Sequence, residues 1–520
     1  MRLLKLLEGL EVKSKTGPLD AEIKGIAYDS RLVEKGYLFA AVRGLSVDGH
    51  NYIREAINRG AAAIVSEKAA ANVIDANQFA FHKDTAFIEV PDSREALALI
   101  SAEFYGRPSG RLSLIGITGT NGKTTTSFIT KNILDAGGKK SGLLGTICYI
   151  TGDVKTAASH TTPESLDLQR CLNEMVYNEM DYAVLEVSSH ALALNRVEGC
   201  AFKAAAFTNF SQDHLDFHGT MDEYFKAKCR IFGYLAPEGA AVLNWDDPKI
   251  RPLAQTLKCK TVTFGLEEGA MIRAEKIKEV RSQKSEVRSK KRGLSEVPPF
   301  AKGGLGGITF DVRTPTSRLR VKSQLIGRFN VYNILTSIGI AYSLGVSEKV
   351  ILQGIENTRP VEGRFENIDE GQKFLCIVDY AHTDDALRKL IEEARHLTKG
   401  RVITVFGCGG NRDKTKRPLM GAAASGLSDL VIVTSDNPRN EDPLEIIKDI
   451  LKGIGRSNYT VQPDRAEAIK EAVSIAREGD TVLVAGKGHE EYQEIKGVRH
   501  HFSDKEVLKE EIKKRLAVGG

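Results

Sequence analysis

Short apolar runs alternate with helix-like amphipathic segments along most of this 520-residue chain. The runs are rich in Val, Ile, Ala and Phe, and their alternation with helices predicts α/β units with largely parallel sheets. The runs fall into three groups. The predicted strands are 24–28, 37–42, 61–65 and 87–90 in the first group, 112–117, 182–187, 204–210, 240–244 and 261–264 in the second, and 374–378, 401–406, 429–434 and 480–485 in the third.

These three groups predict three domains. At roughly 150 residues for an average domain, a chain of this length holds three or four. A turn-rich stretch, Tyr105-Gly-Arg-Pro-Ser-Gly110, is suited to a linker and follows the first group. We therefore expect α/β domains at residues 1–110, 111–359 and 360–520. In open α/β sheets ligands bind beyond the carboxyl ends of the strands, where this chain places Gly, Asp and His clusters.

One segment, residues 279–307, breaks this pattern. Glu-Val-Arg-Ser occurs in it twice, at 279–282 and 286–289, and its second half is rich in Pro and Gly. Such a composition predicts a solvated surface insertion, in preference to a basic arm for nucleic acid. Nine Lys/Arg and three Glu at 273–292 give a net +6, so the remaining 500 residues carry −1 of the chain's +5. The positive charge is therefore local, and we expect no nucleic-acid partner.

Composition narrows the class of protein further. Hydrophobic residues make up 42% and charged residues 27%, as in soluble globular chains. The seven cysteines are widely spaced and never form Cys-x-x-Cys, which indicates a reducing compartment and neither a disulfide framework nor a zinc knuckle. The N-terminus is typical of an amphipathic helix, and no apolar stretch approaches the roughly 18 residues of a membrane span. We expect a cytoplasmic monomer without membrane insertion.

The strongest local signal for chemistry is Ile115-Gly-Ile-Thr-Gly-Thr-Asn-Gly-Lys-Thr-Thr125, which leaves a predicted strand and enters a helix. Glycines let backbone N–H groups surround a phosphate, the helix N-terminus favours its charge, and Lys123 adds a cation. The hydroxyl of Thr124 or Thr125 would hold Mg²⁺. Ile117 occupies the first glycine position of the general P-loop pattern, so the match is to the variant Thr-Gly-Thr-Asn-Gly-Lys-Thr. In this strand–turn–helix context a phosphate loop is favoured over a Gly-rich turn without ligand.

Further groups suited to a nucleotide-bound magnesium site follow in the second domain. Glu186 ends a predicted strand, and Asn209 and His214 lie just beyond another. His214 and His218 have the i, i+4 spacing of a zinc pair, but the Glu of a His-Glu-x-x-His helix and a third ligand are absent nearby. Without the preceding phosphate loop, a structural histidine would be the better interpretation. By its pattern alone, Lys228 is an exposed helix lysine.

Taken together, these residues resemble the Mur ligases, which are ATP-dependent amide-forming enzymes of peptidoglycan synthesis. The resemblance covers almost the whole chain and is closest to the members that add the third residue of the stem peptide. The ordered motifs that carry it are Asp29–Arg31, Thr118–Thr125, His160–Pro163, Glu186–His190, Asn209–His218, Leu325–Asn333, Gly363–Glu366, Asp379–His382, Gly407–Asp413, Asp436–Arg439 and Gly486–Glu490.

The resemblance implies a uridine-nucleotide-binding N-terminal α/β domain, a central P-loop ATPase-like parallel-sheet domain and a C-terminal Rossmann-like domain that binds the incoming amino acid. It implies catalytic roles for Lys123, Glu186, His214 and Lys228, with Lys228 carboxylated. The implied ATP-binding residues are Thr118, Gly119, Thr120, Asn121, Gly122, Lys123, Thr124, Asn330, Arg364, Asp379 and His382. The implied Mg²⁺ ligands are Thr124, Thr125, Glu186, His214 and Lys228.

The same resemblance implies two further substrate pockets. The residues implied to bind the UDP-sugar-peptide are Ser30, Thr161, Thr162, Ser188 and Arg196. Some members also use a Gln at the position of Leu194, so that contact is not carried over. The residues implied to bind meso-diaminopimelate are Arg412, Asp436, Asn437, Pro438, Arg439, Gly486 and Glu490. Asp-Asn-Pro-Arg is the form associated with diaminopimelate. An Arg can bind its extra carboxylate in a bidentate pair, whereas lysine would bring a like charge.

The implied reaction joins meso-diaminopimelate to UDP-N-acetylmuramoyl-L-alanyl-D-glutamate. A carboxylate attacks the γ-phosphate of ATP, and the amine then displaces phosphate from the acyl phosphate. Positioned cations would overcome the repulsion between the two anions. Closure of the third domain about a hinge near Pro360 would keep water from the acyl phosphate.

Two other functions are less compatible with the chain. A folylpolyglutamate synthetase shares the ATP core and the amide chemistry, but has no reason to carry the N-terminal block or Asp436–Arg439. A non-catalytic nucleotide-binding protein or regulatory ATPase has no need for Lys123, Glu186, His214 and Lys228 together.

Overall fold

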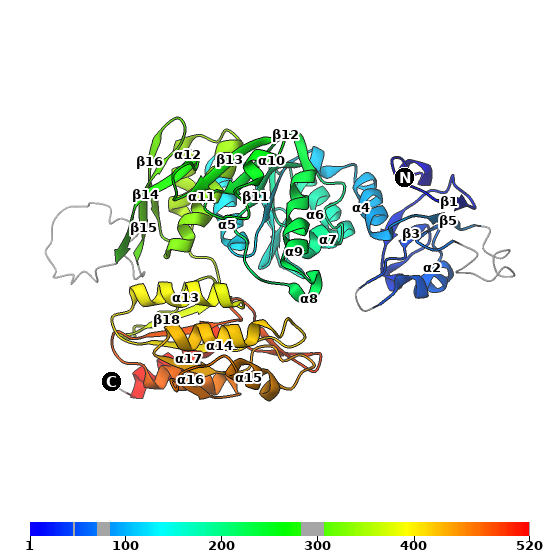
Figure 1. Ribbon diagram of the computed structural model, residues 1–520. Helices are drawn as coiled ribbons and strands as arrows, with labels where there is room; N and C mark the ends of the chain where they lie inside the picture. Colours follow the sequence, from blue (N-terminus) through cyan, green and yellow to red (C-terminus); the bar gives the residue numbers. More distant parts are fainter. Residues whose placement is uncertain (45–46, 70–83, 282–305, 519–520) are drawn as a thin grey trace.

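The computed structural model describes residues 1–44, 47–69, 84–281 and 306–518. Within these ranges the chain forms an α/β structure with three sheets of five, eleven and six strands and a separate two-stranded hairpin. Figure 1 shows the three sheets in three parts of the molecule, with the N-terminal part at one end of the middle part and the C-terminal part beside it. The predicted α/β class with parallel sheets is confirmed.

The N-terminal sheet has the order β1-β5-β4-β3-β2, in which β2 to β5 run parallel and β1 is antiparallel to β5. Its buried strands are the continuous apolar runs of the sequence. Asp92 caps α4 by accepting hydrogen bonds from the backbone N–H groups of Arg94 and Glu95. The elements are α1 (Leu3–Leu6), β1 (Ser14–Thr16), β2 (Gly25–Ala27), η1 (Ser30–Leu32), β3 (Tyr37–Ala40), η2 (Gly49–Tyr52), α2 (Ile53–Asn58), β4 (Ala63–Ser66), β5 (Ala86–Glu89), α4 (Ser93–Phe104) and η4 (Pro108–Gly110).

The middle sheet has the order β16-β15-β14-β13-β12-β11-β6-β10-β7-β8-β9. The strands from β13 to β7 in this order are parallel, and the strand that precedes the glycine-rich loop, β6, lies among them. The carboxyl end of β6 therefore has β10 and β11 as neighbours. The strands are β6 (Ser113–Thr118), β7 (Ser141–Leu144), β8 (Cys148–Ile150), β9 (Lys155–Ala157), β10 (Tyr182–Glu186), β11 (Phe202–Phe207), β12 (Leu235–Asn244), β13 (Lys260–Gly265), β14 (Ile272–Arg281), β15 (Gly306–Arg313) and β16 (Arg318–Ser323).

Helices cover both faces of this sheet, and each face has its own apolar core. One core contains Ile129, Ile133 and Leu134 of α5, the helix that the sequence predicted after the glycine-rich loop. The helices are α5 (Lys123–Ala136), α6 (Ser165–Tyr177), α7 (Ser189–Ala193), α8 (Leu215–His218), α9 (Met221–Cys229), η5 (Arg230–Tyr234), α10 (Leu253–Thr256), α11 (Arg328–Ser343) and α12 (Glu348–Asn357).

The expected insertion at 279–307 is too long at both ends. β14 continues through Arg281 and β15 begins at Gly306, and the two strands pair antiparallel, with Glu279 opposite Ile308 and Arg281 opposite Gly306. The physical reason is that the hydrogen-bonded ladder extends into a segment whose composition alone suggested a loop. The rest of the expected insertion, residues 282–305, lies outside the described residues.

The C-terminal sheet has the order β17-β18-β22-β19-β20-β21, parallel except for the edge strand β17. Apolar cores lie on both of its faces. The elements are β17 (Glu366–Asn367), β18 (Leu375–Asp379), α13 (Asp384–Leu397), β19 (Val402–Phe406), α14 (Lys416–Leu427), β20 (Leu430–Val433), α15 (Pro443–Leu451), β21 (Tyr459–Val461), α16 (Arg465–Ile475), β22 (Thr481–Ala485), β23 (Tyr492–Ile495), β24 (Val498–His501) and α17 (Asp504–Val518).

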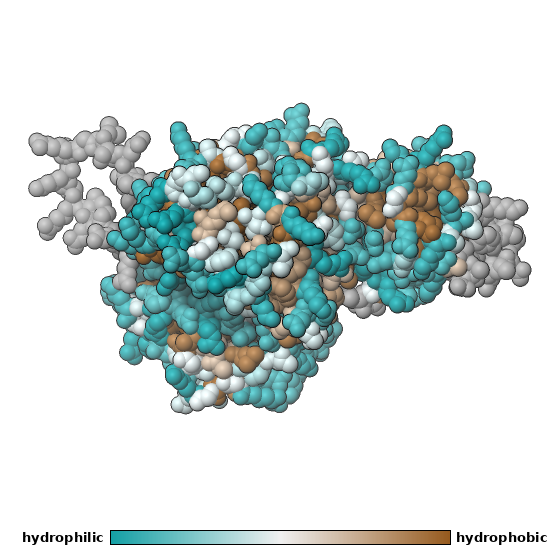
Figure 2. All heavy atoms as spheres, turned by 45° about the horizontal axis from the view of Figure 1, so that its top comes forward, coloured by the Kyte–Doolittle hydropathy of each residue, from teal (hydrophilic) through white to brown (hydrophobic). Residues whose placement is uncertain are grey.

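Polar contacts join the three parts. Tyr28 of the first part donates a hydrogen bond to Asp167 of the second, at 2.7 Å. The connection between the second and third parts is residues 358–365, which include Pro360. The face in Figure 2 is mostly hydrophilic, with separate apolar patches. None of the described helices is long and apolar enough to cross a membrane.

Candidate active site

A cavity of about 810 Å³ lies between the middle and C-terminal parts. Its walls come from the glycine-rich loop, from segments that follow β10, β11 and β12, and from segments that follow β18, β19, β20 and β22. The carboxyl ends of two parallel sheets therefore face one cavity, the location expected for ligands in α/β folds.

The loop between β6 and α5 fits a phosphate-binding role. Gly119 and Gly122 have φ angles of +142° and +85°. A Cβ on Gly119 would lie 1.9 Å from the hydroxyl oxygen of Thr208, and one on Gly122 would lie 2.3 Å from Oδ1 of Asn333. Glycine is therefore required at both positions by conformation and by space. Lys123 Nζ donates to the carbonyl oxygens of Gly119 and Thr120, at 2.9 and 3.0 Å.

Glu186 lies at the floor of the loop and is fully buried. Its carboxylate accepts hydrogen bonds from the hydroxyl of Thr124 at 2.9 Å, and from the backbone N–H and hydroxyl of Thr146 at 2.9 and 3.0 Å. Thr125 lines the cavity beside Thr124. Hydroxyl and carboxylate oxygens beside a phosphate loop are the donors that Mg²⁺ prefers. Among the described residues no three His, Cys, Asp or Glu side chains gather as a self-sufficient metal cage.

Lys228 differs from the exposed lysine that its helical pattern predicts. Its side chain is 1% exposed, and Nζ donates to the carbonyl oxygen of Gly119 at 2.8 Å. Nζ also lies 4.6 Å from the ring centroid of Tyr224. Burial, reinforced by the nearby charge of Lys123, lowers the pKa of Lys228 well below its usual value. A much larger fraction of Lys228 is therefore in the neutral amine form than for a surface lysine at the same pH.

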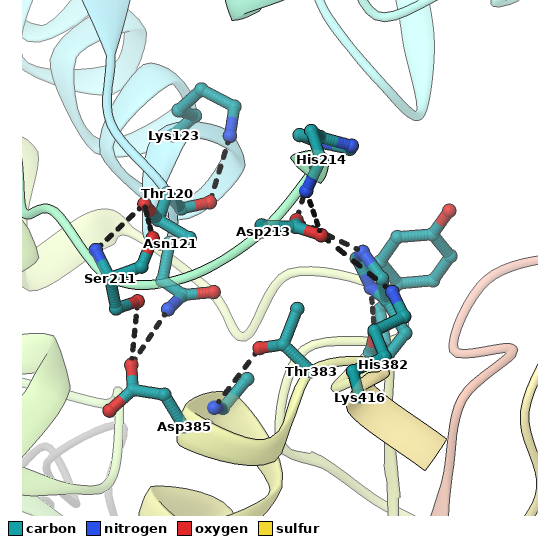
Figure 3. A network of polar contacts seen from close by, with 12 residues as sticks. Thr120, Asn121, Lys123, Ser211, Asp213, His214, His382, Thr383, Asp385 and Lys416 are labelled. Carbon is teal, nitrogen blue, oxygen red and sulfur yellow. Dashed lines mark hydrogen bonds and ion pairs between the residues drawn. The ribbon is translucent and has the colours of Figure 1, made fainter. Parts of the chain in front are cut away.

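Asp213 links the two domains beside the loop (Figure 3). Its carboxylate lies 3.2 Å from Nε2 of His214, 3.8 Å from Nε2 of His382 and 3.6 Å from Nζ of Lys416. Burial alone would raise the pKa of Asp213, but these neighbours outweigh it and lower it below the usual range. Burial also lowers the pKa of His214 to about 2, which leaves the neutral imidazole that ligates metals.

A second contact joins the domains on the other side of the loop. Asp385, in the first turn of α13, accepts hydrogen bonds from Asn121 Nδ2 at 3.2 Å and from Ser211 Oγ at 3.0 Å. Figure 3 shows this carboxylate facing both residues. We call the three residues the Asp385 clasp. The clasp and Asp213 hold the C-terminal part against the loop between β6 and α5.

The expected nucleotide contacts outside the glycine-rich loop fall into two groups, three of them at the C-terminal side of the cavity and one, Asn330, in α11 of the middle part. Arg364, Asp379 and His382 line the cavity, and Arg364 donates to the hydroxyl of Thr124 at 3.2 Å. Asn330 is buried and its amide is used inside the protein: Nδ2 donates to the carbonyl of Ile326, and Oδ1 accepts from Asn333. Asn333, which the sequence did not single out for the site, lines the cavity instead.

The residues expected to contact a UDP-sugar-peptide are more dispersed. Thr161 and Ser188 line the cavity. Thr162 and Arg196 lie behind them: Thr162 donates to the carbonyl of Glu186 at 2.8 Å, and Arg196 donates to the carbonyl of Thr162 at 2.9 Å. Ser30 lies in the N-terminal part and donates to Glu55 at 2.8 Å.

The residues expected to bind the amino acid form a pocket in the C-terminal wall of the cavity. Of the seven expected residues, all but Pro438 line the cavity. The six are Arg412, Asp436, Asn437, Arg439, Gly486 and Glu490. Asn437 Nδ2 donates to Glu490 at 2.8 Å, and its Oδ1 accepts from the fully buried Lys487 at 2.9 Å. Burial and the charge of Asp436 raise the pKa of Glu490. Lys487 is a supporting residue that its sequence pattern did not identify.

Cys408 is one of the residues that line the cavity. Its thiol is buried, and Sγ donates a weak hydrogen bond to the sulfur of Met420 at 3.6 Å. Burial raises the pKa of this thiol to about 12.

Comparisons with known proteins agree with this geometry. Three family models match the chain: "Mur ligase family, catalytic domain" at residues 22–105, "Mur ligase middle domain" at 117–341, and "Mur ligase, glutamate ligase domain" at 363–488. The chain is 42% identical over 513 residues to a UDP-N-acetylmuramoyl-L-alanyl-D-glutamate–2,6-diaminopimelate ligase of Clostridium botulinum, covering 98% of this chain and 99% of that protein.

Solved structures are similar over nearly the full length. A structure of a UDP-N-acetylmuramoyl-L-alanyl-D-glutamate–2,6-diaminopimelate ligase has 30% sequence identity and a TM-score of 0.64, with 99% of each chain covered. The fold is also shared with a MurF ligase from Thermotoga maritima in complex with ADP, at 20% identity and a TM-score of 0.63, covering 96% of this chain and 99% of that one. On its matched domains and full-length relatives, the chain belongs to the Mur ligase family.

Proposed function

We propose that this protein is an ATP-dependent ligase that adds meso-diaminopimelate to UDP-N-acetylmuramoyl-L-alanyl-D-glutamate in peptidoglycan synthesis. The observation that carries the proposal is the shared cavity. The phosphate loop with Lys123 and Glu186 and the pocket of Asp436, Arg439 and Glu490 line the same space. The nucleotide and the amino acid would therefore meet there, and the similarity to diaminopimelate ligases over 98% of the chain supports this choice of substrates. We expect the enzyme to act in the cytoplasm.

The residues around the loop would position the triphosphate. Gly119 and Gly122 let the backbone N–H groups approach the phosphates, and the N-terminus of α5 favours their charge. Lys123 would exchange its two carbonyl contacts for phosphate oxygens. Arg364 reaches the same place from the C-terminal domain through its contact with Thr124. This arrangement would reduce the repulsion between the triphosphate and an incoming carboxylate.

The fit to Mg²⁺ rests on the oxygen donors of Thr124 and Glu186, with His214 and Lys228 nearby. Bound Mg²⁺ would neutralise charge on the transferred phosphoryl group. Lys228 is proposed to be carboxylated, and its burial supports this because the neutral amine is the form that reacts with carbon dioxide. The carbamate would turn a buried amine into an oxygen ligand.

The chemical step begins when the D-glutamyl carboxylate of the dipeptide attacks the γ-phosphate, forming an acyl phosphate and releasing ADP. The free amine of diaminopimelate then attacks the acyl carbon, and phosphate leaves as the amide forms. Thr161 and Ser188, which line the cavity, would contact the dipeptide as it approaches the loop. The contacts of Asp385 and Asp213 would keep the two domains together and limit the access of water to the acyl phosphate.

The pocket in the C-terminal wall offers complementary charges for a zwitterionic amino acid. Asp436 and Glu490 would bind an ammonium group, and Arg439 would bind the terminal carboxylate that distinguishes diaminopimelate from lysine. Arg439 is held in place by its donation to the carbonyl of Gly410 at 2.7 Å, so its guanidinium is preorganised for a second partner.

Phosphate release from ATP tests the proposal. The purified protein is given UDP-N-acetylmuramoyl-L-alanyl-D-glutamate and a panel of third-residue amino acids, each alone and in combination. The expected result is release that requires both the dipeptide and meso-diaminopimelate. Release with nucleotide alone would indicate a regulatory ATPase, and release with a folate and glutamate would indicate the synthetase alternative; either result would overturn the proposal.

A further inference from the structure

Arg465 is a fully buried arginine that lies behind the amino-acid pocket. It is the first residue of α16, and its side chain forms an ion pair with Asp504, the first residue of α17. Both side chains are 0% exposed. Arg465 Nε donates to Oδ1 of Asp504, and Nη2 donates to Oδ2, both at 2.7 Å, which is the bidentate geometry of a strong pair.

The remaining donors of this guanidinium contact the backbone of two pocket segments. Nη2 donates to the carbonyl oxygen of Ala485 at 3.0 Å, and Nη1 donates to that of Ser435 at 3.3 Å. These carbonyls belong to the residues immediately before Gly486 and Asp436, which line the pocket. One planar group therefore connects the ends of β22 and β20, between which β19 lies in the sheet.

The contact fixes a tight arrangement. Gly486 has φ +122°, and a Cβ there would lie 2.4 Å from Oδ2 of Asp436 and 3.8 Å from Nη2 of Arg465. Asp436 thus lies against the Gly486 backbone with the guanidinium close behind. Burial alone would lower the pKa of Arg465. The charge and hydrogen bonds of Asp504, with smaller contributions from Asp436 and Glu490, outweigh burial, so the pKa is raised.

We infer that Arg465 is a positioning residue for the amino-acid substrate. It holds segment 435–439 and segment 486–490 at a fixed separation, and Asp504 orients it. Arg465 itself is buried behind the pocket and acts through Asp436 and Gly486. The inference rests on the proposed function for the identity of the substrate, whereas the positioning of the two segments is independent of it.

The same domain contains a second Arg–Asp pair, at the opposite ends of the strands, that serves as a control; its Arg401 side chain is 36% exposed. Arg401, just before β19, pairs with Asp480, just before β22, at 2.7 Å. Arg401 Nη2 also donates to a backbone carbonyl, that of Ile475, at 2.8 Å. This pair has similar chemistry but lies at the amino ends of the strands, away from the pocket.

The test removes each pair as a unit, because replacing both charges avoids leaving one of them buried without a partner. The Arg465→Met/Asp504→Leu variant is compared with Arg401→Met/Asp480→Leu. For the first, we expect the KM for meso-diaminopimelate to rise about tenfold or more, because small displacements of a binding group are costly, with the KM for ATP unchanged. The control should leave both KM values near wild type.

Hydrogen exchange provides a second measurement on the same proteins. Peptides that contain segments 435–439 and 486–490 should exchange faster in the first variant and not in the control. A KM for diaminopimelate within about twofold of wild type, unchanged exchange, or an equal effect of the control variant would overturn the inference. If the double variant does not fold, Arg465→Lys is judged by the same criteria, because it keeps a charge opposite Asp504 but cannot span both carbonyls.

The two proposals fail separately. A wild-type protein that does not use meso-diaminopimelate would sink the proposed function. The comparison of hydrogen exchange would still decide whether Arg465 holds the two segments.

Discussion

Replacing Arg439 with alanine provides a quantitative test of amino-acid selection. Its backbone is held on both sides, because its N–H donates to the carbonyl of Glu494 at 2.9 Å and its carbonyl accepts from Lys496 at 2.6 Å. Its side chain is only 21% exposed and donates to Gly410 at 2.7 Å. Little conformational entropy is therefore lost when the guanidinium binds a carboxylate.

The expected loss follows from the bonds that the guanidinium would make. Each hydrogen bond between charged groups contributes roughly 1.5–3 kcal/mol net, and two such bonds are available in a bidentate pair. Taking the lower values, about 3 kcal/mol, gives a fall of about 10²-fold in kcat/KM for meso-diaminopimelate. The truncation also leaves the Gly410 carbonyl and the partly exposed Glu494 without this partner.

The assay is phosphate release with meso-diaminopimelate and with L-lysine, measured for wild type, Arg439→Ala and Arg439→Lys. The ratio of the two kcat/KM values should fall about 10²-fold in the alanine variant, because lysine lacks the carboxylate and gains from loss of a like charge. Arg439→Lys should lie between the two, since an ammonium pairs with only one oxygen at a time. A ratio in Arg439→Ala within about threefold of wild type would refute the reasoning.

Three further predictions follow from the cavity and from His190, whose ring centroid lies 4.7 Å from that of His214. Lys228→Ala should abolish turnover, and short carboxylic acids should partly restore it if the carbamate is present; absence of rescue would leave the carboxylation without support. Asp385→Ala should increase the radius of gyration measured by small-angle scattering relative to Asp384→Ala, because only Asp385 holds Asn121; equal radii would contradict the clasp. Burial lowers the pKa of His190 to about 4, whereas the unfolded chain takes up this proton at about pH 6.5. Between these two values the free energy of unfolding should therefore decrease as the pH falls, by up to about 1.4 kcal/mol per pH unit. His190→Gln should have a shallower decrease in the unfolding midpoint between pH 7 and 4.5, and an unchanged slope would count against this.

The buried parallel strands could be predicted from the sequence because they are continuous apolar runs. The predicted strand 401–406 is β19, Val402–Phe406, and 480–485 is β22, Thr481–Ala485. Short exposed strands carry no such signal: β9 and β21 are exposed along their whole length. β16 alternates exposed and buried residues, but half of its residues are Arg or Lys and it follows a segment of low complexity, so its apolar positions give only a weak strand signal.

The site divides in the same way. The glycine-rich loop between a strand and a helix could be predicted because its signal is local, with glycines, Lys123 and the helix start in one stretch. The burial of Lys228 could not, because its partner carbonyl, Gly119, is 109 residues away. Asp213 and Lys416 become neighbours only when two domains meet, so neither had a local signal that would distinguish it from a surface charge.

Cys408 bears on the choice of inhibitor chemistry. A cysteine in the wall of a ligand cavity is an attractive target for electrophilic warheads, which react with the thiolate. Here burial raises the pKa of the thiol to about 12, so almost no thiolate is present at neutral pH. The thiol also donates a weak hydrogen bond to the sulfur of Met420. Acrylamides or chloroacetamides built on an amino-acid or nucleotide scaffold are therefore not expected to react with Cys408. Compounds for this cavity are better designed as reversible ligands that span the phosphate loop and the pocket around Arg439.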